Sequence, residues 1–154
     1  MADPVGYEGF DEARRALKKM QDPEKSREYK QANFDIANEV VIPAARANAS
    51  TRLQRRAAGT LVAVRTESGG SVRLGQGFPA ALGAEFGADR NQPRRVFRYG
   101  KSFNARGFNQ FEPWRGSDRG AGYFLWPAIR EQEGEIINRY DQLFRDLFDD
   151  EGGG

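Results

Sequence analysis

The chain has 154 residues, 38% of them hydrophobic, a formal net charge of +2 and a mean hydropathy of −0.76. It contains no cysteine and no histidine, which removes thiol nucleophiles, disulfides, the commonest transition-metal ligands and the usual general base near neutral pH. We therefore expect no metal, no cofactor and no enzymatic activity. The N-terminus lacks an apolar signal core and no run approaches the roughly 18 apolar residues of a membrane span, so we expect a soluble, non-secreted protein.

Charge is distributed unevenly along the chain. Residues 1–43 carry seven basic and nine acidic residues, residues 44–119 carry fourteen and five, and residues 120–154 carry three and eight. A basic middle of net +9 thus lies between acidic ends of net −2 and −5. Either the ends and the middle attract each other, within or between subunits, or the middle binds phosphate. General charge patterning favours mutual attraction.

The first half of the chain is predicted to be helical. Residues 1–9 read as an N-terminal arm, and Asp11 is a plausible N-cap for a helix over residues 10–20. Apolar residues at helical spacing predict a second helix that begins near Glu24. Pro43 lies inside this pattern, which predicts a kinked or split helix that ends at Gly59.

The middle of the chain gives the clearest strand signal. "TLVAVRT" alternates, "ESGG" supplies turn residues and "SVRLGQG" returns, which predicts a β-hairpin over residues 60–77. "FPAALGAEFG" could be a third strand or a helical turn, and its glycines and proline argue against a regular helix. Residues 88–122 read as a long loop rich in Gly, Arg, Asn and aromatic residues, with one further strand near "RRVFRYG".

The C-terminal segment is predicted to be one long helix from Trp126 to Asp149, about 36 Å long at 1.5 Å per residue. Pro127 suits its first turn, and residues 151–154 read as a flexible tail. The predicted fold is α+β, with residues 10–150 as a single domain. A small antiparallel β-sheet (the hairpin plus one or two further strands) is packed by a kinked N-terminal helix and the long C-terminal helix.

The order of these elements resembles the tail-component, or tail-completion, family of long-tailed bacteriophages. The family pattern runs from a helix with a proline near its end, through a hairpin, to a strand that ends in Glu-Phe-Gly, and then to an aromatic–Leu–x–Pro–Ala helix start. The corresponding positions here are Pro43, residues 60–77, residues 85–87 and residues 124–128. The resemblance covers roughly residues 32–148. A Thr-Gly-x-Leu turn common in the family is only loosely echoed by "AAGTL", and residues 88–122 are longer than the family loop.

The resemblance implies a structural virion protein made in the bacterial host cytoplasm. Its relatives form sixfold rings at the head–tail junction, or neck, where they complete the tail and join it to the head connector. The implied partners are other copies of the chain, the stopper or adaptor, the tail terminator and the tail tube, with DNA passing through the lumen and no membrane. The alternative from the residues alone is a nucleic-acid-binding module that uses the basic segment 44–119.

Glu85 is the acid whose surroundings most need an explanation. It lies among small and apolar residues, where a carboxylate must find water or a partner. A catalytic acid would need a second acid or base, and Glu112 and Asp118 are available only in loops. A structural role is favoured, in which Glu85 pairs with an arginine or accepts backbone N–H bonds at a strand end. Gly83 and Gly87 would then allow close packing, and Phe86 would enter the core.

Candidate interface residues come from the same region and from the C-terminal helix start. Trp114 and Arg115 could form an exposed anchor, although Trp114 could equally lie in the core. Trp126 opens an amphipathic helix, which favours a core position. Arginines interleaved with phenylalanines after residue 88 suit nucleic acid, but pairing with acids of a neighbouring C-terminal helix is favoured. The candidates are Glu85, Phe86, Gly87, Arg94, Arg95, Phe97, Trp114, Arg115 and Trp126.

Overall fold

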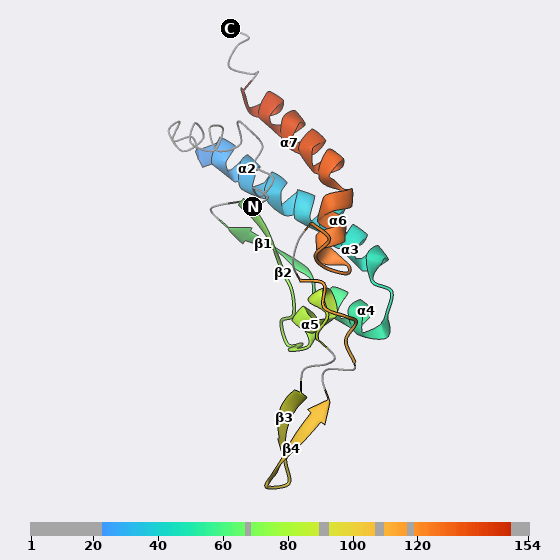
Figure 1. Cartoon of the computed structure of the whole chain (residues 1–154). Helices are drawn as coiled ribbons and strands as arrows, with labels where there is room; N and C mark the ends of the chain where they lie inside the picture. Colours follow the sequence, from blue (N-terminus) through green and yellow to red (C-terminus); the bar gives the residue numbers. More distant parts are fainter. Residues whose placement is uncertain (1–22, 67–68, 90–92, 107–109, 117–118, 149–154) are drawn as a thin grey trace.

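The computed structural model describes residues 23–66, 69–89, 93–106, 110–116 and 119–148. The predicted N-terminal arm, the helix over residues 10–20 and the tail at 151–154 lie outside the described residues. Helices and two antiparallel two-stranded sheets make up the described part, which confirms the α+β class (Figure 1).

The first described helix passes through Pro43 without stopping. It consists of α2 (Pro23–Ile36), a π-helical turn η1 (Ala37–Val41) and α3 (Ile42–Asn48). In the π turn the Ile42 amide donates to the Ala37 carbonyl, one residue further back than in an α-helix. This wider turn comes directly before Pro43, whose ring would crowd a regular helix and which has no N–H to donate. The predicted distortion at Ile42–Pro43 is therefore a π turn and not a break.

The helix ends at Ala49, which is extended (ψ 115°). It restarts as α4 (Arg52–Ala58) behind a capping box, in which Thr51 and Gln54 each accept a backbone N–H of the other. The predicted end at Gly59 is confirmed, since Gly59 is the C-cap of α4.

The predicted hairpin is confirmed with shorter strands. β1 (Val62–Thr66) pairs antiparallel with β2 (Gly69–Arg73), with Ala63 opposite Val72. Ala63 and Val72 pack against the main core, whereas Val62 on the other face is 44% exposed. The hairpin therefore covers the core with one face only.

A second hairpin lies within the loop predicted over residues 88–122. β3 (Pro93–Arg98) pairs antiparallel with β4 (Lys101–Arg106) and forms a separate two-stranded sheet. The prediction of a single strand near "RRVFRYG" was thus too cautious. Figure 1 shows the β3–β4 hairpin at the opposite end of the molecule from α2 and α7 (Glu133–Phe148).

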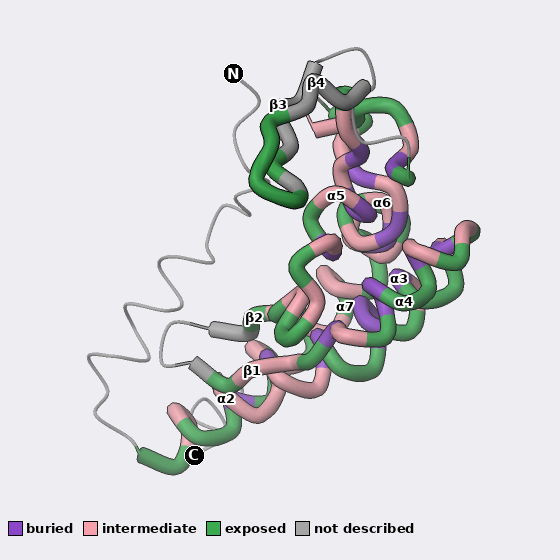
Figure 2. Tube along the Cα trace, turned by 90° about the horizontal axis from the view of Figure 1, so that it is seen from below, coloured by how far each residue is buried: buried purple, intermediate pink, exposed green. Residues whose placement is uncertain are grey.

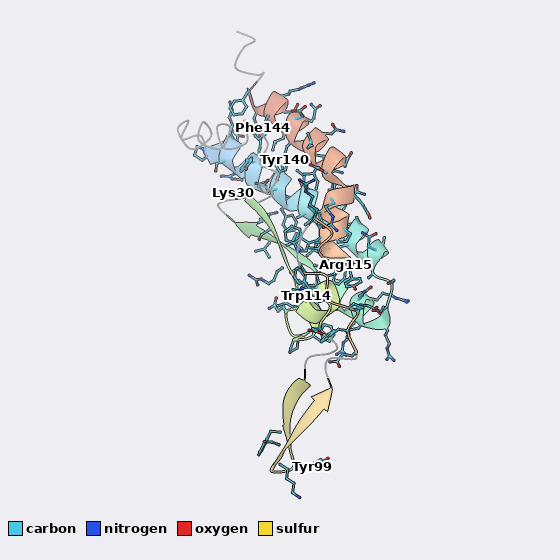
Figure 3. All side chains as sticks on the ribbon, viewed as in Figure 1. Lys30, Tyr99, Trp114, Arg115, Tyr140 and Phe144 are labelled. Carbon is cyan, nitrogen blue, oxygen red and sulfur yellow. The ribbon has the colours of Figure 1, made fainter. Side chains whose placement is uncertain are left out.

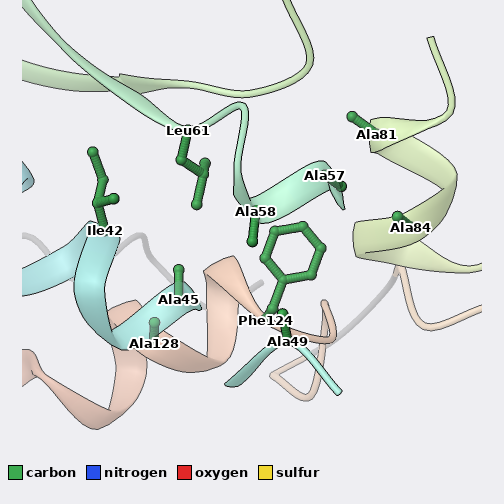
Figure 4. Close-up of a cluster of buried hydrophobic side chains, with 10 residues drawn as sticks. All are labelled: Ile42, Ala45, Ala49, Ala57, Ala58, Leu61, Ala81, Ala84, Phe124 and Ala128. Carbon is green, nitrogen blue, oxygen red and sulfur yellow. The ribbon is translucent and has the colours of Figure 1, made fainter. Parts of the chain in front are cut away.

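The main core lies where α3, α4, α5 (Ala81–Phe86) and α6 (Leu125–Glu131) meet (Figures 2 and 4). Most of its members are alanines, which let the helices approach closely, and the largest are Leu61 and Phe124, 1% and 0% exposed. The buried members are Ile42, Ala45, Ala49, Ala57, Ala58, Leu61, Ala81, Ala84, Phe124 and Ala128.

The predicted long C-terminal helix is interrupted. α6 ends at Gln132 (φ −93°, ψ 8°), and α7 follows directly. α7 packs its apolar stripe along α2, where the rings of Tyr29 and Phe144 stack at 6.4 Å and Leu147 is buried. The prediction of one uninterrupted helix was therefore wrong at Gln132, where the helix breaks.

The packing of α7 on α2 makes the stability of the protein depend on pH through Tyr140. Its hydroxyl donates to Asn33 Oδ1, and burial, together with the nearby Tyr29, raises the pKa of Tyr140 from 10.0 to about 12. Because the pKa is raised in the folded state, the stabilisation is complete below pH 10 and is lost as pH rises towards 12. Tyr140→Phe is expected to lower the free energy of unfolding by about 1 kcal/mol near neutral pH and to flatten its fall above pH 10. Urea unfolding at several pH values measures both, and an unchanged alkaline slope would contradict the assignment.

Candidate functional site

The "ALGAEFG" segment is helical and not a strand. α5 covers Ala81–Phe86 and ends at Gly87, whose amide donates to the Gly83 carbonyl at 2.8 Å. A Cβ on Gly83 would lie 2.5 Å from ring atoms of Phe111, so the aromatic ring packs directly on the helix backbone there. The glycines that argued against a helix in the sequence thus serve close packing.

Glu85 is completely buried (0% exposed) and accepts three backbone N–H bonds from the start of α6. Oε2 accepts from Phe124 at 3.2 Å and from Leu125 at 2.9 Å, and Oε1 accepts from Trp126 at 2.9 Å. The next residue, Pro127, has no N–H to satisfy. One carboxylate therefore accounts for the amide donors of the first turn of α6 and lies at the positive end of its dipole.

This geometry answers the question that Glu85 raised. The prediction that it accepts backbone N–H bonds is confirmed, but the donors belong to a helix start and not to a strand end. Sequence reasoning missed the donors because they lie about 40 residues further along the chain.

Two glycines make room for this arrangement. Gly122 has φ +85°, and a Cβ there would lie 2.1 Å from Glu85 Oε1. Gly87 has φ +76°, and a Cβ there would lie 2.2 Å from the Pro113 carbonyl oxygen. Both positions require glycine for conformation and for space.

Backbone hydrogen bonds join the three segments around Glu85 into one unit, which we call the Glu85 junction (residues 85–88, 112–115 and 122–126). The junction is fixed by a short series of bonds: Ala88 N–Glu112 O at 2.9 Å, Arg115 N–Phe86 O at 2.6 Å, Gly122 N–Arg115 O at 2.7 Å and Tyr123 N–Glu85 O at 2.8 Å. The Arg115 guanidinium lies over the Tyr123 ring at 4.5 Å, which holds this predicted interface residue on the junction.

An exposed apolar surface lies on the junction. Leu82 and Phe86 are four residues apart and share a face of α5, and the Trp114 ring lies 6.3 Å from the Phe86 ring. Leu82 is 64% and Trp114 60% exposed, and Phe86 is half-buried rather than in the core as predicted. We call Leu82, Phe86 and Trp114 the apolar strip. Of the two positions predicted for Trp114, an exposed anchor or the core, the structure shows the exposed one. Figure 3 labels Trp114 and Arg115.

The prediction that Trp126 belongs to the core was wrong, since it is 46% exposed. Phe124 and Ala128 carry the buried face of α6, both at 0% exposure. Trp126 lies two residues from each, which is about 200° around a helix of 3.6 residues per turn. It therefore points away from the core.

The remaining candidates lie in the β3–β4 hairpin. The register places Arg94 opposite Ala105 and Arg95 opposite Asn104, and Phe97 is 72% exposed. Tyr99 at the turn is 97% exposed and was missed by sequence reasoning. The Tyr-Gly pair between two basic segments was a turn signal that could have revealed it.

The described residues contain no group of three or more His, Cys, Asp or Glu side chains that could hold a metal ion. Nor do they include a helix with the length and apolar character needed to cross a membrane. Comparisons of the chain with protein-family models, with curated proteins and with solved structures give no match.

Proposed function

We propose that the chain is a structural, non-enzymatic virion protein of a tailed phage, whose copies form a ring at the head–tail junction. The order of Pro43, the hairpin, residues 85–87 and residues 124–128 supports the neck location, because it resembles the tail-completion family. The observation that carries an assembly role is the apolar strip, with its exposed Trp114 and Leu82.

The strip is suited to binding because its backbone is already ordered. Trp114 is flanked by Pro113 and Arg115, and the hydrogen bonds of the Glu85 junction fix both neighbours. A partner would therefore lose little backbone entropy on binding there. Tryptophan is also the residue type most enriched at binding hot spots.

The partner that fits the strip is α7 of a second copy. A ring needs two different surfaces on each subunit, because its contacts are heterologous. α4 packs against α5 and carries Arg52, Arg55 and Arg56, all exposed, whereas α7 carries four acidic and two basic residues. The exposed arginines of α4 thus complement the net −2 of α7.

The test compares the mass of the purified chain in solution, alone and with tails that lack it, for the natural sequence and for Trp114→Ala. We expect a ring, or stoichiometric recruitment to tail ends, for the natural sequence. Trp114→Ala is expected to weaken association by about 2 kcal/mol, on the order of 30-fold, with an unchanged unfolding midpoint because its ring is mostly exposed.

Tyr99→Ala is the matched control, since it removes an exposed aromatic ring outside the strip. It is expected to leave association unchanged. Equal association of the natural sequence and Trp114→Ala would remove the strip from the interface. A monomer that ignores tails but binds DNA at low salt would overturn the neck assignment in favour of the nucleic-acid-binding alternative.

A further inference from the structure

The β3–β4 hairpin is rich in basic residues. Its 14 residues from Pro93 to Arg106 contain no acidic residue. Five of them are basic, namely Arg94, Arg95, Arg98, Lys101 and Arg106. Figure 1 shows the hairpin at one end of the molecule, away from α2 and α7.

The shape of the hairpin suits a groove in a nucleic acid. Each strand has six residues, which gives a ribbon about 20 Å long, and the sheet has two strands only. The major groove of double-stranded DNA, about 12 Å wide, admits a two-stranded β-ribbon of this kind. Basic residues along both strands would then lie near the phosphates on each side.

Tyr99 is an unfavourable residue for the turn between β3 and β4. Arg98 pairs with Lys101, so Tyr99 and Gly100 form a two-residue loop with φ +54° and +72°. Two positive φ values define a type I′ turn, where Asn-Gly is preferred and a tyrosine is strained by about 1 kcal/mol or more. Tyr99 is 97% exposed at the tip of the hairpin, so its ring is available to contact a ligand (Figure 3).

We propose that the β3–β4 hairpin binds double-stranded DNA through the phosphate backbone, without reading sequence, with Tyr99 in contact at its tip. This goes beyond the proposed assembly role and does not depend on a ring. A protein partner would need an acidic surface to match five basic residues, whereas the DNA backbone supplies a regular row of phosphates. The net −2 of α7 could match only part of the charge of the hairpin.

The experiment measures binding of the full chain to a fluorescein-labelled duplex of about 20 base pairs by anisotropy, between about 50 and 200 mM salt. Five phosphate contacts predict a slope of log K against log salt of about −4.5. The triple variant Arg94→Gln, Arg95→Gln, Arg98→Gln is expected to bind at least tenfold more weakly at low salt and to lose about 3 units of that slope. Tyr99→Asn favours the turn and should still weaken binding several-fold.

The matched control is the triple variant Arg27→Gln, Arg73→Gln, Arg119→Gln, which removes the same charge from exposed positions elsewhere. It is expected to retain most of the affinity. Equal losses in the two triple variants, or no binding at the lowest salt, would overturn the proposal. If the hairpin variants lose self-association but keep DNA binding, the proposal is also overturned. The hairpin would then be a contact between protein subunits. Trp114→Ala is expected to lose self-association and to keep DNA binding. The proposal for the apolar strip and the proposal for the hairpin can therefore fail independently.

Discussion

Replacing Glu85 by alanine is expected to lower the free energy of unfolding by about 4 kcal/mol. The change leaves three N–H groups at the start of α6 without an acceptor and opens a cavity at a completely buried position. Each unsatisfied buried donor costs about 1–3 kcal/mol, and these three share one partner. Urea unfolding followed by circular dichroism measures the loss.

Two further variants separate the chemistry of Glu85 from general effects. Glu85→Gln keeps the shape but turns an amide donor towards backbone N–H groups, and about 2 kcal/mol is the expected cost. Glu28→Ala, at an exposed glutamate of α2, should change stability by about 0.5 kcal/mol or less. A cost below about 1 kcal/mol for Glu85→Ala would mean that the Glu85 junction does not hold the start of α6.

Replacing Gly122 by alanine is expected to cost about 3 kcal/mol or more, through two effects. The backbone at φ +85° strains any residue with a Cβ, and the new methyl would lie 2.1 Å from Glu85 Oε1 and 2.7 Å from the Trp126 Cβ. Either the carboxylate or the turn must move, and both movements break bonds to α6.

Gly77→Ala isolates the first of these effects. Gly77 also has a positive φ, +74°, but a Cβ added there would have no neighbour within 4 Å, so about 1 kcal/mol is expected. The double variant Glu85→Ala, Gly122→Ala should be less destabilised than the sum of its parts, because removal of the carboxylate makes room for the methyl. Additive costs in this cycle would show that the two residues do not interact.

The sequence correctly predicted those elements whose pattern lies within one short stretch of the chain. The alternation of residues 60–66 and the turn residues after them predicted β1 and β2, because neighbouring positions on a strand are enough to define its faces. The helix predicted from Trp126 to Asp149 includes α7. The structural role of Glu85 followed from its surroundings, although its donors did not.

Features that depend on distant residues could not be predicted in this way. "ALGAEFG" is a helix because Phe111 packs on Gly83, which the segment itself cannot reveal. The exposure of Trp126 follows from the burial of Phe124 and Ala128, which fixes how α6 is rotated. Only one strand of the β3–β4 hairpin was predicted, because its sequences PRRVFR and KSFNAR lack the apolar alternation on which strand prediction relies.

The bond from the Ala88 amide to the Glu112 carbonyl has a consequence for the engineering of the chain. The backbone pairs at this point like neighbouring strands, with Ala88 bridged to Pro113, so the two ends of the segment that carries the β3–β4 hairpin lie side by side. Each doubling of the length of a segment closed in this way costs only about 0.6 kcal/mol in closure entropy. Changes in the length or charge of the β3–β4 hairpin are therefore expected to leave the Glu85 junction and the main core folded.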